Sequence, residues 1–462
     1  MVPYNHSEKF ESLRKQYPVF YYHAFNYEFK NNDLILTFDF CIGKDIRFRP
    51  VSVIPFHNSY AAFYSSNQGH VLENLIFHIG MIELISYWKC ACPPKIVVET
   101  GYLDTDAVAW WKKIYYHGLG EFFYCNNIQT NYSDFVEIIS NNAKSYQKQS
   151  FVLNNETIIP VGGGKDSPVT LELLKDGNSI PLIINQREAT SACVEVAGYK
   201  DDFLQIDRTI DPLLLDLNAK GFLNGHTPFS AMLAFYALLL AVLSQKKNIA
   251  LSNESSANEA TVQDSDVNHQ YSKSFEFESD FRHYVSRYIN DELNYYSFLR
   301  PLSELQIACL FAQLPQYFSV FKSCDAGSKT DVWCCRCPKC LFTFIILSPF
   351  VEPEALSVVF GTNLFENETL ISVLKELTGE TEVKPFECVG TRKEVCIALC
   401  EACKHYETLP PLWQYFQTTP LYQQYKDTDL EKELSHFEKE HFLRPNEWQR
   451  LMKIKDVIKM YV

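Results

Sequence analysis

The sequence predicts an α/β protein built on a central parallel β-sheet, with an N-terminal α/β domain before it and a mostly helical region after it. A strand-like run at residues 157–161 leads through a glycine-rich turn into a helix-like run at residues 167–175. Two further apolar runs, at residues 181–185 and 248–251, alternate with a helical pattern at residues 228–243. This alternation is typical of parallel strands joined by crossover helices.

The chain of 462 residues is longer than one ordinary core requires, so we expect several units. Strand-like residues 34–40 and helix-like residues 72–88 predict an N-terminal α/β domain at residues 1–149. The central domain then occupies residues 150–350. Residues 351–462 have mostly helical patterns and form the predicted C-terminal region.

Charge and hydropathy argue against two classes of function. The 42 basic and 56 acidic residues give a net charge of −14, which disfavours a protein that wraps nucleic acid. The longest apolar run, residues 231–243, is shorter than the roughly 20 residues that a membrane helix needs. A secretory signal is not expected either, because its apolar core would have to contain Glu8, Lys9, Glu11, Arg14 and Lys15. We therefore expect a cytoplasmic protein with neither nucleic acid nor membrane as a partner.

The glycine-rich turn has the composition of a phosphate-binding loop. Three glycines allow the backbone to approach an anion closely, and the helix that follows presents free N–H groups at its first turn. The turn is not a Walker A loop, because Asp166 stands where that motif has Ser or Thr. The alternative is a turn that serves only helix packing. The predicted cofactor-binding residues here are Gly162, Gly163, Gly164, Lys165, Asp166 and Ser167.

This turn resembles the pyrophosphate loop of the ATP pyrophosphatase superfamily, Ser-Gly-Gly-x-Asp-Ser, with Gly162 in place of the first serine. The resemblance implies a sheet of the adenine-nucleotide α-hydrolase type and cleavage of ATP to AMP and pyrophosphate, with an acyl group activated as an adenylate. It also implies that the loop holds the leaving pyrophosphate, that Lys165 stabilises its charge and that Asp166 helps to place Mg²⁺.

Four cysteines with the spacing C-x9-C-x2-C-x2-C predict a structural zinc site. They are Cys324, Cys334, Cys337 and Cys340, out of 15 cysteines in the chain. Cys335 lies beside this set, so the spacing leaves open whether Cys334 or Cys335 is the ligand. Buried free cysteines without metal are the alternative. A similar arrangement occurs in the 7-cyano-7-deazaguanine synthase branch of the superfamily, where the zinc is structural.

Seven segments in order along the chain resemble the UDP-N-acetylmuramoyl-L-alanyl-L-glutamate epimerase family. Together they extend across nearly the whole chain, although each one alone is weak. The segments are HGLGEF at 117–122, PVGGGKDS at 160–167, GHTP at 225–228, SNESSAN at 252–258, VNHQYSKS at 267–274, CCRCPKC at 334–340 and FECVG at 386–390.

This resemblance implies an ATP- and Mg²⁺-dependent isomerase that inverts the terminal L-Glu of UDP-MurNAc-L-Ala-L-Glu to D-Glu for peptidoglycan synthesis. The chemistry is reasonable, because an adenylated carboxylate no longer carries the negative charge that opposes removal of the neighbouring α-proton. Two alternatives remain open. One is another adenylating enzyme, either a ligase or a deazapurine-type synthase, and the other is a nucleotide-binding regulatory protein without turnover.

Several polar residues are candidates for the site beyond the loop. Ser252, Asn253 and Glu254 follow the strand-like run at residues 248–251, at the edge of the sheet where we expect ATP or substrate contacts. A solvated loop is the alternative for these three residues. Inversion needs a proton acceptor and a proton donor on opposite faces, and the pair is not distinguishable from the sequence. The residues of suitable type are His226, His269, Lys273 and Cys388, and the catalytic set also includes Lys165 and Asp166.

Overall fold

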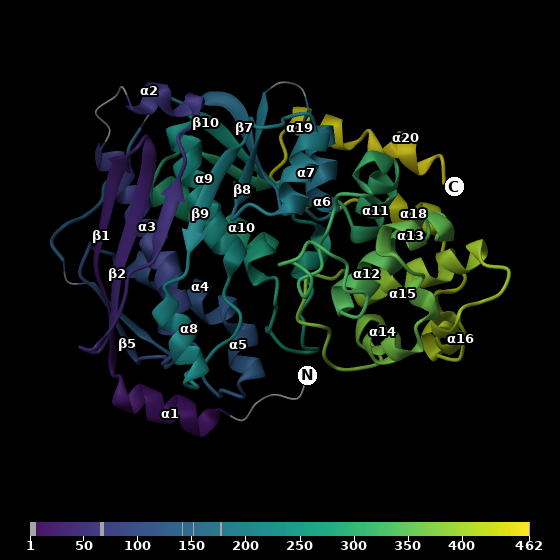
Figure 1. The fold of residues 1–462 in the computed structure, drawn as a ribbon, viewed down its shortest axis with the longest axis horizontal. Coiled ribbons are helices and arrows are strands. Elements are labelled where there is room, and N and C mark those ends of the chain that lie inside the picture. Colours follow the sequence, from purple (N-terminus) through teal and green to yellow (C-terminus); the bar gives the residue numbers. More distant parts are fainter. Residues whose placement is uncertain (1–5, 65–68, 141, 151, 176–177, 462) are drawn as a thin grey trace.

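One large β-sheet runs through most of the protein. This computed structural model describes residues 6–64, 69–140, 142–150, 152–175 and 178–461, so residues 1–5 of the stretch considered for a secretory signal lie outside it. The sheet has 11 strands in the order β11-β10-β7-β8-β9-β4-β2-β1-β5-β6, and β3 pairs with β2 (Figure 1). The predicted α/β class is confirmed.

The central part of the sheet is parallel. Its strands are β7 (Asn154–Pro160), β8 (Ser179–Ile184), β9 (Leu204–Thr209), β10 (Lys246–Leu251) and β11 (Asn294–Ser297). The order of these strands reverses between β7 and β10, and ligands of such sheets bind beyond the carboxyl ends of the strands at this point. The connecting helices are α6 (Asp166–Leu173), α7 (Glu188–Val196), α8 (Pro212–Ala219), α9 (Phe229–Leu243) and α10 (Phe275–Tyr288).

The N-terminal strands extend the same sheet. β1 (Val19–Lys30), β2 (Asp33–Ile42), β3 (Ile46–Phe48) and β4 (Val51–Ile54) pair antiparallel, whereas β5 (Lys95–Val98) and β6 (Glu137–Ser140) continue parallel beside β1. The N-terminal helices are α1 (Ser7–Gln16), α2 (Ala61–Tyr64), α3 (Gly69–Trp88), α4 (Thr105–Gly118) and α5 (Gly120–Cys125).

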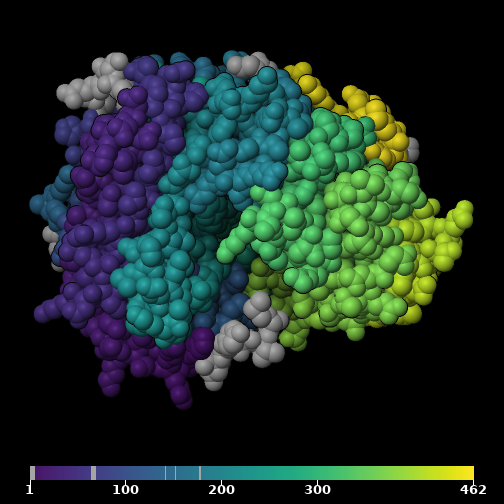
Figure 2. Space-filling model, viewed as in Figure 1, coloured from purple at the N-terminus to yellow at the C-terminus, as the bar shows by residue number. Residues whose placement is uncertain are grey.

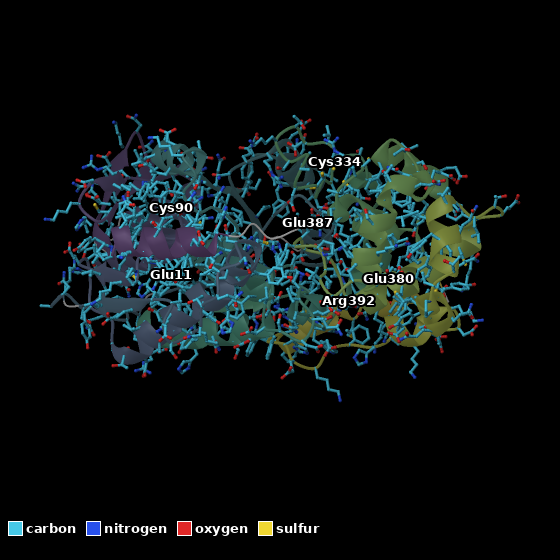
Figure 3. The ribbon with its side chains drawn as sticks, turned by 90° about the horizontal axis from the view of Figure 1, so that it is seen from below. Glu11, Cys90, Cys334, Glu380, Glu387 and Arg392 are labelled. Carbon is cyan, nitrogen blue, oxygen red and sulfur yellow. The ribbon has the colours of Figure 1, made fainter. Side chains whose placement is uncertain are left out.

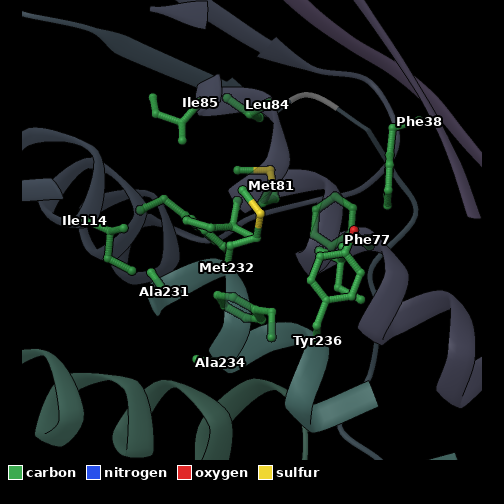
Figure 4. Close-up of a cluster of buried hydrophobic side chains, with 14 of the residues drawn as sticks. Phe38, Phe77, Met81, Leu84, Ile85, Ile114, Ala231, Met232, Ala234 and Tyr236 are labelled. Carbon is green, nitrogen blue, oxygen red and sulfur yellow. The ribbon is translucent and has the colours of Figure 1, made fainter. Parts of the chain in front are cut away.

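Helices α3 and α9 form the centre of the first hydrophobic core. Both are apolar around most of their circumference, so both are buried on nearly all sides. Their contact is packed with side chains such as Phe77 and Met81 from α3 and Met232 and Tyr236 from α9 (Figure 4). This core lies against the sheet and holds the N-terminal and central strands in one unit.

Strands β4 and β9 join the two parts of the sheet. They pair antiparallel, with Ser52 opposite Arg208. A buried polar network reinforces this junction: the Arg208 guanidinium donates to Glu83 at 2.5 and 2.8 Å, and the Tyr236 hydroxyl lies 3.0 Å from Glu83 and 2.6 Å from the Ser52 hydroxyl. The sheet is therefore continuous across residue 150. The predicted division of the chain at residues 149 and 350 stays a prediction.

The predicted helical character of the C-terminal region is confirmed. A second hydrophobic core gathers around α12 and α15 and also includes one side of the central sheet (Figure 1). The helices are α11 (Glu304–Ala312), α12 (Pro338–Leu347), α13 (Pro353–Phe360), α14 (Ile371–Thr378), α15 (Arg392–Ala402), α16 (Pro411–Gln417), α17 (Pro420–Tyr425), α18 (Leu430–Leu434), α19 (Pro445–Leu451) and α20 (Ile454–Ile458).

A search of the helices in the described part of the chain finds none that combines the length and the apolar character needed to cross a membrane.

Candidate active site

The glycine-rich turn between β7 and α6 forms an open cradle. Gly163 has a φ of +81°, a left-handed conformation that favours glycine, and its carbonyl accepts a hydrogen bond of 2.7 Å from the Lys322 backbone N–H. A Cβ placed on Gly162 would have no described heavy atom within 4 Å. The buried Ser167 hydroxyl has no hydrogen-bond partner among the described residues. Free backbone and hydroxyl donors at a helix N-terminus fit a phosphate group.

The two glycines offer a matched pair of variants. We expect Gly163→Ala to lower the melting temperature, because a left-handed non-glycine residue costs about 1–2 kcal/mol and the new Cβ would lie 3.2 Å from the Ala189 Cβ. Gly162→Ala should keep the wild-type melting temperature, since its Cβ would point into open space. Thermal unfolding followed by circular dichroism compares the two, and equal melting temperatures would contradict the assigned role of Gly163.

A cavity of about 450 Å³ lies beside this cradle, at the carboxyl ends of β7 and β10. Figure 2 shows a hollow where the teal central segments meet the green C-terminal part. One wall is apolar, with Leu182 and Ile184 of β8 on one side and Phe229 and Leu233 of α9 on the other. The Phe229 side chain is 46% exposed, which is unusual for a phenylalanine. A flat apolar group such as a purine ring fits this wall.

The opposite part of the cavity is charged. Lys165 is buried between two carboxylates, 2.5 Å from Asp166 and in an ion pair with Glu304. Burial alone would raise the pKa of the Asp166 carboxyl, but Lys165 and Lys339 lower that pKa, so Asp166 is an anion. Burial raises the pKa of Glu304. Asp166 thus has the charge and the position to bind a magnesium ion next to a phosphate.

The loop after β10 contributes Ser252, Asn253 and Glu254 to the same cavity, as the sequence indicates. The Ser252 hydroxyl lies 2.8 Å from the Thr170 hydroxyl of α6, and the Asn253 side chain donates to Ser297 at 3.0 Å. Glu254 is buried. The first contact holds the loop against α6, and the second attaches it to the end of β11.

A buried arginine positions two parts of the site at once. The Arg300 guanidinium donates to the backbone carbonyls of Glu254 and Lys273 and forms an ion pair of 3.0 Å with Glu278. Because Arg300 is almost fully buried, these contacts form in a low-dielectric environment where they strengthen one another. Arg300 therefore links the loop after β10 to the segment that carries Lys273.

The predicted proton-transfer residues gather at one end of the cavity. Lys273 and Cys388 line it, and the Lys273 ammonium donates to the Cys388 sulfur at 3.0 Å. His269 and His226 lie next to this pair, with their ring centroids 4.5 Å apart. The Glu121 carboxylate lies 2.5 Å from His269 Nδ1 and 3.4 Å from His226 Nδ1.

The charges of this cluster are unusual. Burial alone would raise the pKa of the Cys388 thiol, but Lys273 and His269 lower it to about 6. Burial alone would lower the pKa of His269, but hydrogen bonds to Cys388 and Glu121 raise it to about 9. Burial, with His269 as the next cause, lowers the pKa of His226 to about 3. Near neutral pH the cluster therefore contains a thiolate, an imidazolium and a neutral imidazole.

The four predicted zinc-binding cysteines converge in front of α12. Sulfur atoms about 2.3 Å from a tetrahedral zinc ion are about 3.8 Å apart. The sulfur of Cys337 lies 3.7 Å from that of Cys324 and 3.5 Å from that of Cys340, which in turn lies 3.8 Å from that of Cys334. The geometry of the thiols thus fits zinc.

The structure also distinguishes between the two adjacent cysteines. Cys335 turns its thiol toward the Phe360 carbonyl at 3.1 Å, so Cys334 is the residue that completes the set of four. Figure 3 shows Cys334 and Glu387 at the junction of the central and C-terminal parts, the latter beside Cys388 in the sequence.

Four residues of the site were missed by the sequence analysis: Glu121, Arg300, Glu304 and Lys339. Glu121 lies inside the segment at residues 117–122 quoted for the family resemblance, which was its only signal. Glu304 sits at the start of α11, where an acidic residue is common in any helix. Lys339 likewise lies inside the quoted segment at residues 334–340. The contacts that give these four residues their roles join distant segments, and the sequence pattern does not show them.

Comparisons with known proteins give a consistent result. The family models for the MurL N-terminal domain and the MurL C-terminal domain match residues 11–298 and 319–418. A protein of Xanthomonas oryzae pv. oryzae named UDP-N-acetyl-alpha-D-muramoyl-L-alanyl-L-glutamate epimerase is 33% identical over 384 residues, which cover 81% of this chain and 84% of the relative.

Two further relatives have the same name. The protein of a Micromonospora species is 36% identical over 342 residues, covering 72% of this chain and 74% of its own. The protein of Salinispora tropica is also 36% identical over 342 residues, covering 72% of each chain. No solved structure matches the chain.

Proposed function

The chain belongs to the MurL family of UDP-N-acetylmuramoyl-L-alanyl-L-glutamate epimerases, and from this premise we propose that it uses Mg²⁺ and ATP to invert the terminal L-Glu of UDP-MurNAc-L-Ala-L-Glu to D-Glu. The reaction forms an acyl-adenylate and releases AMP and pyrophosphate. One observation carries the proposal: the phosphate cradle and the cluster of Lys273 and Cys388 line the same cavity. Activation and proton transfer can therefore occur on one bound glutamyl residue.

Different residues of the cavity bind different parts of ATP. The apolar wall between β8 and α9 binds the adenine ring, and the N–H groups of the cradle together with the Ser167 hydroxyl bind phosphate oxygens. Lys165 lies beside the cradle and balances the charge of the leaving pyrophosphate, and Asp166 holds Mg²⁺. Mg²⁺ held by Asp166 would supply positive charge that neutralises the phosphates.

Adenylation prepares the α-carbon for inversion. Removal of the α-proton next to a free carboxylate would place a second negative charge beside the first one. An acyl-adenylate has lost the first charge and delocalises the new one into its carbonyl, so the α-proton becomes more acidic. Proton return on the opposite face and hydrolysis of the adenylate then give D-Glu.

The cysteine site has a structural role in this proposal. A shell of four thiolates leaves a zinc ion no open position for substrate or water. The cluster lies at the start of α12, whose first turn is close to the cavity through Lys339. Zinc would therefore fix the helix that carries Lys339 into the cavity wall.

The proposed reaction is tested by incubating the protein with Mg-ATP and UDP-MurNAc-L-Ala-L-Glu in D2O. We expect AMP release, one deuterium at the glutamate α-carbon and D-Glu after acid hydrolysis. AMP without deuterium would contradict the epimerase and favour a ligase or synthase that transfers the acyl group, which the product mass would identify. Absence of AMP would contradict turnover altogether and favour a nucleotide-binding regulatory protein.

The proposed substrate also has a consequence for location. ATP and a UDP-linked peptidoglycan precursor are both cytoplasmic metabolites, so we propose that the reaction takes place in the cytoplasm.

A further inference from the structure

Three parts of the chain that are distant in sequence form one line of contacts at the wall of the cavity. Glu121 comes from α5, His269 from the segment before α10, and Cys388 from the loop before α15. Glu121 Oε2 lies 2.5 Å from His269 Nδ1, and His269 is near enough to Cys388 to lower the pKa of its thiol. Only Cys388 of these three lines the cavity.

Cys388 is the last residue of this series, and its sulfur can accept a proton. Lys273 donates to the Cys388 sulfur at 3.0 Å, and the Lys339 ammonium donates to the Cys388 backbone carbonyl. These cations and His269 favour the thiolate form of Cys388 over the thiol. The half-buried thiolate is thus held next to the space where the activated substrate must bind.

The other groups near the substrate space are less suited to this role. Lys273 stays protonated, because Cys388 and Glu254 raise its pKa although burial alone would lower it. Glu304 is occupied by its ion pair with Lys165. His226 is neutral, but it is not among the residues that line the cavity.

We propose that the Cys388 thiolate is the base that removes the α-proton on one face of the activated glutamyl residue, and that Glu121 and His269 are positioning residues that keep it ionised. This inference rests on the proposed function and names one of its two proton-transfer groups. The α C–H bond breaks, its electron pair moves into the enolate of the acyl-adenylate, and an S–H bond forms. The proton that arrives on the opposite face derives from solvent water through a second acid of the cavity.

The decisive test separates activation from proton transfer. We expect Cys388→Ala to release pyrophosphate from ATP at a rate close to that of the wild type, while deuterium uptake at the α-carbon falls about 10²–10⁴-fold. Cys388→Ser should behave in the same way, because a serine hydroxyl is not ionised near neutral pH, and it preserves the size of the side chain. Cys403→Ala serves as the matched control, because Cys403 is half-buried and its thiol donates to the Cys400 carbonyl outside the cavity.

The outcomes distinguish this inference from the proposed function. Wild-type activity with undiminished deuterium uptake in both Cys388 variants would overturn the inference and leave the epimerase in place. Loss of pyrophosphate release together with deuterium uptake in folded variants would also overturn it, since Cys388 would then serve activation. A wild-type protein without AMP release or D-Glu formation would overturn the proposed function itself.

The positioning role is tested by the pH profile of deuterium uptake. Lys273, Lys339 and His269 face Cys388, and Glu121 and His226 face His269. The rate should rise as Cys388 loses its proton near pH 6. The rising limb exists because the thiol form cannot accept a proton, and its position depends on the positive charge of His269, which lowers the pKa of Cys388.

After Cys388, Glu121 is the next group that raises the pKa of His269, so Glu121→Gln should let His269 lose its positive charge at lower pH. The rising limb should move to higher pH, since less positive charge then faces Cys388. A merely structural role of Glu121 would lower the rate equally at every pH, and that result would overturn the positioning role. Glu195→Gln, which changes an exposed residue on α7, is the control and should leave the rising limb in place.

Discussion

Asp166→Asn will slow the formation of AMP about 10²–10³-fold. The asparagine keeps the shape of the side chain but loses the charge that binds Mg²⁺ next to the phosphates, and a bound metal contributes several kcal/mol to phosphoryl chemistry. Folding should be retained, because Lys165 keeps its second ion pair with Glu304. The measurement is AMP and pyrophosphate release under saturating Mg-ATP.

The matched control for this variant is Asp216→Asn on α8, an exposed aspartate outside the cavity. It should release AMP at the wild-type rate. If Asp166→Asn did so as well, Asp166 would have no part in holding the metal, and its place in the cavity would reflect only its ion pair with Lys165.

Replacing any one of the four clustered cysteines with serine will remove zinc and strongly destabilise the C-terminal part. Binding of zinc to four thiolates contributes on the order of 10 kcal/mol to folding, and Cys340 is fully buried at the start of α12. We therefore expect Cys340→Ser to contain no zinc, to melt at a much lower temperature and to aggregate readily. Elemental analysis of the purified protein and thermal unfolding measure these effects.

Cys335→Ser provides the comparison within the same segment. Its thiol faces the Phe360 carbonyl and not the other four sulfurs, so this variant should retain its zinc and nearly all of its stability. Loss of zinc from Cys335→Ser, with retention in Cys334→Ser, would mean that the neighbouring thiol is the ligand in solution.

The sequence predicted those parts of the fold that depend on local patterns. The run at residues 157–161, the glycines and the helix after them appear as β7, the cradle and α6, because strand and helix periodicity and glycine turns act over a few residues. The junction of β4 and β9 was not predictable in this way. No sequence pattern indicates that Ser52 pairs with Arg208, because this pairing depends on the twist and strand order of the whole sheet.

The same distinction holds for the site. The cradle and the cysteine cluster could be recognised from composition and spacing, and the structure brings each set together. The choice between Cys334 and Cys335 needed the structure. Glu121 contacts His269, which is 148 residues away in the sequence, and Glu304 contacts Lys165, which is 139 residues away. These two contacts are visible only in the folded structure. The roles of all these residues in binding ATP, Mg²⁺ and zinc stay predictions.

The continuous sheet restricts how the molecule can open for a bulky substrate. A hinge between the N-terminal and central parts would have to break the β4 and β9 ladder and the buried network of Arg208, Glu83 and Tyr236. The described residues of the N-terminal and central parts therefore form one continuous unit beside the cradle. The loops at residues 323–339 and 386–390 come from the other side of the cavity and are attached to the C-terminal helices. The wall of the cavity that carries Cys388 and Lys339 thus belongs to the C-terminal helical part, whereas the wall that carries the cradle belongs to the sheet.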